Sequence, residues 1–128
     1  MKQIALSLGL GFVLFTLVVA CGDSGKYGGG APAPGSALMS PAGSAGRMEN
    51  DEGVGHYKQG HWDVAEGHFR KALQADATLA EAHYNLGLAL DKMSKHDEAT
   101  TAFKKAVELA PGNPAIKDSE ILKKHISM

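Results

Sequence analysis

The feature that most constrains this chain is an internal repeat, in which residues 53–72 match residues 87–106. Regular internal repeats with periods of about 20–50 residues indicate supersecondary units that bury their apolar faces by stacking on one another. A period of about 34 residues is typical of a unit of two antiparallel helices, so the sequence predicts an all-α fold, a short α-solenoid. The matching pairs are Gly53 and Gly87, Lys58 and Lys92, Asp63 and Asp97, Ala65 and Ala99, Phe69 and Phe103, Lys71 and Lys105, and Ala72 and Ala106.

The second copy, residues 80–113, has residue types that suit two closely packed helices. Small residues stand where the helices touch, larger apolar residues stand beside them, and a proline ends the second helix. These residues are Gly87, Ala99 and Ala106, then Leu86, Leu90 and Phe103, and finally Pro111. In this arrangement the segment resembles a tetratricopeptide repeat, a helix-turn-helix unit of protein-binding solenoids.

The first copy, residues 46–79, is less regular, because Glu52 and His56 stand where the second copy has Leu86 and Leu90. Residues 114–126 are predicted to form a capping helix that begins at Pro114. The folded domain is therefore expected at residues 47–128, with two repeats and the cap. Stable solenoids usually contain three or more repeats, which favours a protein partner or a second copy of the chain.

Residues 1–20 have the basic start, apolar stretch and small final residue of a secretory signal peptide. Val18-Val19-Ala20-Cys21 resembles the lipobox of bacterial lipoproteins. The resemblance implies cleavage before Cys21, whose sulfur and amino group then carry fatty acyl chains such as palmitate. With Gly22 in the place after the cysteine, the same resemblance implies an outer-membrane anchor that faces the periplasm. An ordinary signal peptide, or an uncleaved anchor with an incidental cysteine, remains an alternative.

Residues 21–46 follow the signal and contain few groups that could build a core. From position 22 to position 46 the chain consists mostly of Gly, Ala, Pro and Ser, without apolar periodicity. This composition predicts a disordered tether between the lipid and the repeats.

Little in the sequence indicates catalysis. The chain contains no nucleophile elbow, phosphate-binding loop or dinucleotide-binding pattern, so we expect no enzymatic activity and no cofactor. A net charge of −1 argues against nucleic-acid binding. His56, His61 and His68, with Asp63 among them, are assigned to the first helix, the turn and the second helix of repeat 1. They are therefore not expected to converge on a metal ion.

Peptide binding has better support, because ligands of tetratricopeptide proteins usually lie along the first helices of the repeats. This resemblance implies a concave binding face made of Asn50, Val54, Tyr57, Lys58, Glu81, Tyr84, Leu88, Asp91 and Lys92. The predicted function is a membrane-tethered adaptor that binds a protein or peptide in the bacterial cell envelope, in the assembly of an envelope complex. The alternatives are a periplasmic metal or cofactor handler that uses the histidines, and a structural subunit of a larger complex.

Overall fold

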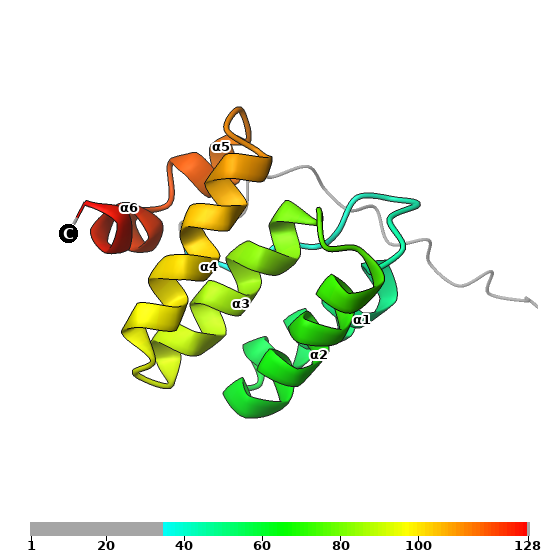
Figure 1. The fold of residues 1–128 in the computed structure, drawn as a ribbon. Coiled ribbons are helices and arrows are strands. Elements are labelled where there is room, and N and C mark those ends of the chain that lie inside the picture. The colour runs from blue at the N-terminus through cyan, green and yellow to red at the C-terminus, as the bar shows by residue number, and fades with distance from the viewer. Residues whose placement is uncertain (1–34, 128) are drawn as a thin grey trace, which may run out of the picture.

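The structure, a computed structural model, describes residues 35–127 and shows a stack of helices within them (Figure 1). Along this part of the chain no strand is present, which confirms the predicted all-α class. The helices are α1 (Arg47–Lys58), α2 (Trp62–Ala75), α3 (Ala80–Lys92), α4 (His96–Leu109), α5 (Pro114–Lys117) and α6 (Glu120–Ile126).

The first four helices form two antiparallel hairpins, α1 with α2 and α3 with α4, and α2 also packs on α3 (Figure 1). Each hairpin turn contains one residue with a left-handed backbone. These residues, Gly60 with φ +82° and Ser94 with φ 62°, occupy equivalent positions in the two repeats. The period seen in the sequence is therefore also a period of backbone conformation, as a short solenoid requires.

The presence of glycine at the matching positions 53 and 87 has a steric explanation. A Cβ atom built on either residue would lie 2.6 Å from Cε1 of the phenylalanine on the next helix, Phe69 or Phe103. Both phenylalanines are fully buried in the core. The close approach of α1 to α2, and of α3 to α4, therefore depends on the missing side chain.

The C-terminal cap differs from the single helix predicted for residues 114–126, because it is divided into α5 and α6. Each piece has its own N-cap: the Asn113 side chain accepts from the Ala115 amide, and Ser119 accepts from the Leu122 amide. The Ser119 hydroxyl also accepts a hydrogen bond from the Tyr84 hydroxyl at 2.8 Å. The break therefore places a buried polar contact against α3.

Within residues 35–46, expected to be the end of a disordered tether, residues 37, 38 and 40 are instead buried against the helices. Ala37 and Leu38 are buried in the same apolar cluster as α1 and α3 residues, and the segment passes behind α3 in Figure 1. The prediction of disorder was wrong here because the small, polar composition concealed the one large side chain that docks, Leu38.

The predicted signal peptide (residues 1–20), Cys21 and the first part of the predicted tether (residues 21–34) lie outside the described residues. Within residues 35–127, none of the helices combines the length and apolar character required to cross a bilayer.

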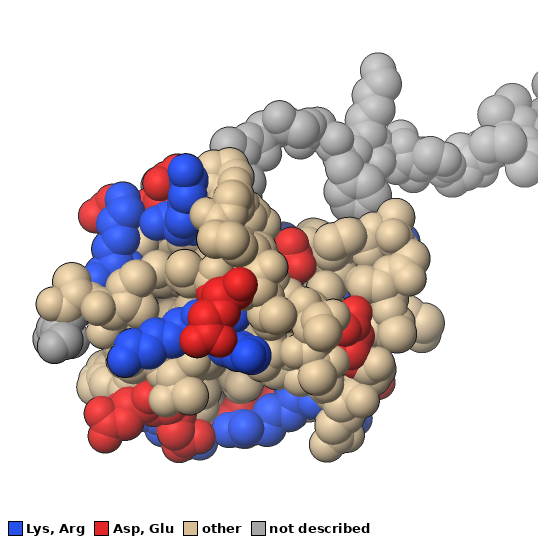
Figure 2. All heavy atoms as spheres, turned by 45° about the horizontal axis from the view of Figure 1, so that its top comes forward, with Lys and Arg blue, Asp and Glu red and all other residues tan. Residues whose placement is uncertain are grey.

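Charged side chains of both signs are interleaved on the molecular face that Figure 2 shows. Some of the pairs connect the repeats: Glu66 on α2 contacts Arg70 at 2.8 Å and Lys95 at 3.1 Å, and Arg70 contacts Glu98 on α4 at 3.2 Å. Burial opposes the ionisation of Glu66, but these two basic groups hold the pKa of its carboxyl below the usual value. The network thus favours the packing of α2 beside the second hairpin.

Candidate functional site

The predicted concave face lies on α1 and α3, but much of it is not open to solvent. Its large apolar and amide side chains are part of the core, whereas its two lysines are exposed. The buried members are Asn50, Val54, Tyr57, Tyr84 and Leu88, the partly buried ones are Glu81 and Asp91, and the exposed ones are Lys58 and Lys92.

Two buried asparagines of this face bind the backbone of the chain's own segment. Asn85 on α3 accepts from the Leu38 amide at 2.7 Å and donates to the Leu38 carbonyl at 2.7 Å. Asn50 on α1 donates to the same carbonyl at 2.9 Å and accepts from Asn85 at 2.8 Å. Both asparagine side chains are fully buried, so these bonds form where water does not compete.

The contact extends to the first repeat through Asp51, whose Oδ1 accepts from the Ser40 amide at 2.9 Å. Asp51 and Asn85 occupy the same position in their respective repeats. Equivalent side chains therefore take amides that lie two residues apart along the segment. This is a geometry for holding an extended strand of chain by its backbone.

From residue 38 to residue 40, side chains of the segment alternate between the groove and solvent. Leu38 is 7% exposed and shares its apolar cluster with Val54 and Leu88, whereas Met39 is 44% exposed. The groove, defined here as the surface of Asn50, Asp51 and Asn85 with the apolar residues around Leu38, thus combines backbone recognition with one side-chain pocket.

The remaining predicted residues have other roles in the structure. Lys92 lies 5.9 Å above the ring of Trp62, and Asp91 contacts His125 of α6 at 2.8 Å. Burial, with smaller effects of Tyr84 and Asp91, raises the pKa of Tyr57 to about 12. Burial also raises the pKa of Tyr84. Both phenols are therefore neutral packing groups at physiological pH.

Sequence reasoning found Asn50 but missed Asp51 and Asn85. The signal for Asn85 was present, because it is an amide in the apolar run Asn85-Leu-Gly-Leu-Ala-Leu90 of α3. A buried amide in such a run requires hydrogen-bond partners. What the sequence did not show is that the partner is Leu38, 47 residues away.

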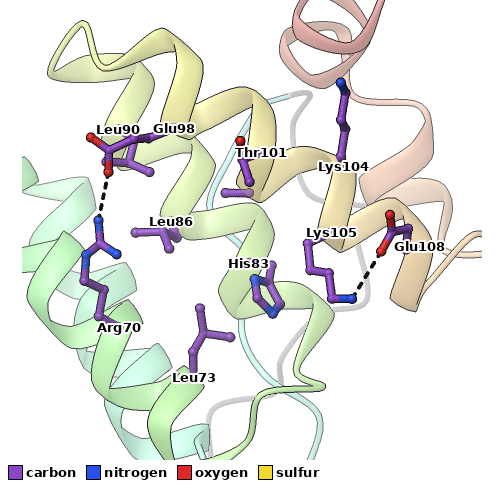
Figure 3. Close-up of a pocket in the computed structure, with 11 residues that line it drawn as sticks. Arg70, Leu73, His83, Leu86, Leu90, Glu98, Thr101, Lys104, Lys105 and Glu108 are labelled. Atoms are coloured by element: carbon purple, nitrogen blue, oxygen red, sulfur yellow. Dashed lines mark hydrogen bonds and ion pairs between the residues drawn. The ribbon is translucent and has the colours of Figure 1, made fainter.

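A second hollow lies on the opposite side of α3, between α2 and α4, with a volume of about 710 Å³ (Figure 3). Leu73 and Leu86 point into it together with His83. Charged pairs stand at its edge, Arg70 with Glu98 and Lys105 with Glu108, each at 3.2 Å. It contains no backbone-binding amide comparable to Asn85 among its lining residues.

Three histidines that were expected to lie apart are in fact neighbours. The His56 and His68 rings stack with centroids 5.2 Å apart, and His61 lies 5.8 Å from His56. The turn between α1 and α2 brings them together, and Glu52 rather than Asp63 completes the group. A second group, Asp91, His96 and His125, lies at the contact of the second hairpin with α6.

Comparison with known proteins agrees with the repeat. Residues 80–113 match the sequence model of the tetratricopeptide repeat family. No curated protein matches the chain. The matched repeat indicates a role in protein–protein interaction, and the family is generally non-catalytic.

Proposed function

Because residues 80–113 form a tetratricopeptide repeat, we propose that the chain is an adaptor of the bacterial cell envelope, held at a membrane by lipid on Cys21. Its groove on α1 and α3 receives an extended segment of a protein partner. The observation that carries the proposal is the set of hydrogen bonds from Asn50 and Asn85 to the Leu38 backbone. Backbone contacts of this kind do not depend on the side chains of the bound segment, so they suit a partner's chain equally well.

The chain's own segment is then a resident occupant of the groove. It is joined directly to α1 through residues 41–46, so its effective concentration at the groove is on the order of millimolar or higher. A partner segment must outcompete it, with an extended backbone and an apolar side chain in the place of Leu38. This competition excludes weak, unspecific chain segments and selects for a partner that binds tightly.

The experiment measures how tightly the groove binds a free peptide when the resident segment is intact and when it is weakened. A fluorescent peptide with the sequence of residues 35–44 is titrated with the full chain, followed by fluorescence anisotropy. Leu38→Asp places a charge in the apolar pocket and weakens the resident segment, so we expect peptide affinity to rise more than about tenfold over wild type. Met39→Asp adds the same charge one residue further on, at an exposed side chain, and should behave as wild type.

A third variant tests whether the anisotropy change reports peptide bound in the groove. Adding Asp51→Ala to Leu38→Asp removes the acceptor for the second amide and should weaken the peptide several-fold. Envelope extracts applied to the same variants identify natural partners: capture should increase with Leu38→Asp and not with Met39→Asp. A Leu38→Asp chain that stays helical by circular dichroism yet binds the peptide no better than wild type would refute a groove that accepts segments.

A further inference from the structure

The open end of the first repeat carries a cluster of metal-ligand residues. Glu52 and His56 stand one turn apart on α1, and His68 faces them from α2. One ligand atom from each lies within 4.8 Å of the other two. We propose that Glu52, His56 and His68 form a binding site for a divalent transition cation of the zinc type. This inference is independent of peptide binding by the groove.

The repeat itself shows that these residue types are not required by the fold. The equivalent positions in the second repeat are Leu86, Leu90 and Ala102, all of which line the hollow of Figure 3. There they lie beside α2 of the preceding hairpin. No helix precedes α1 within residues 35–127, so in the first repeat the same three positions lie at the end of the stack, with Glu52 exposed and both histidines partly buried. Polar side chains of any kind would suit a solvent-exposed end of the stack. At the end formed by the first repeat, two imidazoles and a carboxylate instead converge.

The donor set suits such an ion. Two histidine nitrogens and one carboxylate oxygen are a common three-ligand zinc set, with the fourth position left to water or to another side chain. The ligand atoms of the three residues lie within 4.8 Å of one another. Ligand atoms around a tetrahedral zinc ion are about 3.4 Å apart, given bonds of about 2.1 Å, so the cluster must contract. Glu52 is 62% exposed and free to rotate inward.

Neighbouring groups support the arrangement. Oε2 of Glu49 lies 2.8 Å from Nδ1 of His68. A carboxylate that holds one ring nitrogen of a histidine orients the ring and leaves the other nitrogen for a metal. Nδ1 of His56 is buried and has no hydrogen-bond partner among the described residues. His61, 5.8 Å from His56 between ring centroids, is close enough to supply a fourth ligand after a side-chain rotation.

The other histidine cluster is organised differently, which is why the site is assigned to the first. His125 uses both ring nitrogens, contacting Asp91 at 2.8 Å and Thr100 at 3.0 Å. It is only 5% exposed. These contacts attach α6 to the second hairpin, and a cation would have to displace them.

The test is a zinc titration of the full chain in detergent micelles, without an affinity tag. All proteins carry Cys21→Ser, because a thiolate is itself a zinc ligand. We expect one zinc ion to bind per chain at micromolar concentration by calorimetry. His56→Gln and His68→Gln should each weaken binding at least tenfold, and Glu49→Gln about tenfold, the effect usual for a residue that orients a ligand. The matched control His83→Gln, which removes a histidine outside both clusters, should bind as the parent does.

A second measurement locates the ion. Zinc should shift the imidazole proton resonances of His56 and His68 and leave those of His83 unchanged, in variants that circular dichroism shows to be folded. Absence of binding at 100 µM zinc would overturn the site. So would binding that survives the double variant His56→Gln/His68→Gln, or binding lost in His96→Gln and retained in that double variant.

Discussion

At the scale of single residues, the hairpins depend on glycines that are packed too closely against the next helix to carry a side chain. Gly53 and Gly87 show this twice, at equivalent positions, and each faces a phenylalanine ring that is itself fully enclosed. The glycine is therefore repeated in the sequence because both hairpins need the same close contact between a helix backbone and a phenylalanine ring. Gly67 on α2 differs from them, because a Cβ atom there would meet nothing within 4 Å.

These glycines give a paired prediction. Gly87→Ala places a Cβ 2.6 Å from Cε1 of Phe103, which has no space to retreat, so we expect a loss of about 1–3 kcal/mol in the free energy of unfolding. Gly67→Ala adds the same methyl group on an open helix surface and should increase stability by about 0.5–1 kcal/mol. Urea denaturation of both variants measures the two values. Equal effects would mean that helix propensity, and not the contact with Phe103, explains the glycine repeated in the two hairpins.

At the scale of elements, the contact of α1 with α3 places Tyr57 near Tyr84 and Asp91. Burial first, then these two neighbours, disfavours the phenolate and raises the pKa of Tyr57 from 10.0 to about 12. The folded state thus holds the phenolic proton more tightly than the unfolded state does. The resulting stability is complete below pH 10 and is lost as the pH rises from 10 to 12.

Tyr57→Phe tests this contact because it keeps the ring and removes the ionisable hydroxyl. Between pH 8 and pH 11.5 the wild type should lose about 1–2 kcal/mol more unfolding free energy than the variant. All other ionisable groups are common to both proteins, so their effect cancels in the difference. Denaturant titrations at a series of pH values supply the measurement. Parallel loss of stability in the two proteins would show that Tyr57 ionises as readily in the folded chain as in the unfolded one.

The helices themselves were predictable because their signals are local: an apolar period, the turn residues between paired helices and, after α4, the terminating Pro111. The sites were less so, because each depends on residues brought together by folding. Leu38 lies in a segment whose composition favours disorder, and its partners Asn50 and Asn85 are distant in sequence. His56 and His68 were assigned correctly to two helices, yet the hairpin stacks their rings. Assignment to different elements was therefore no evidence that they lie apart.

At the scale of the whole molecule, the chain covers part of the apolar surface of its own two repeats. Residues 37 and 38 fill the face of α1 and α3, and Ile116 and Leu122 of the divided cap join the same buried cluster. These contacts come from residues outside the two repeats, so the number of repeats alone does not reveal them. A partner is consequently expected to exchange with the resident segment, while the rest of the core stays closed.

Exchange of this kind at an envelope surface depends on the anchor, which makes Cys21→Ser the decisive change for the proposed location. Several acyl chains on one residue hold a protein firmly, since each buried methylene contributes about 0.8 kcal/mol. Loss of the sulfur should abolish acyl labelling and move the chain from the membrane fraction to the soluble fraction. The helical circular dichroism of the repeats should persist, because the described core begins at residue 35. Ser24→Ala, three residues further on, is the control that leaves the lipidation site intact. A Cys21→Ser chain that remains tightly bound to membranes would instead indicate an uncleaved apolar anchor at residues 1–20.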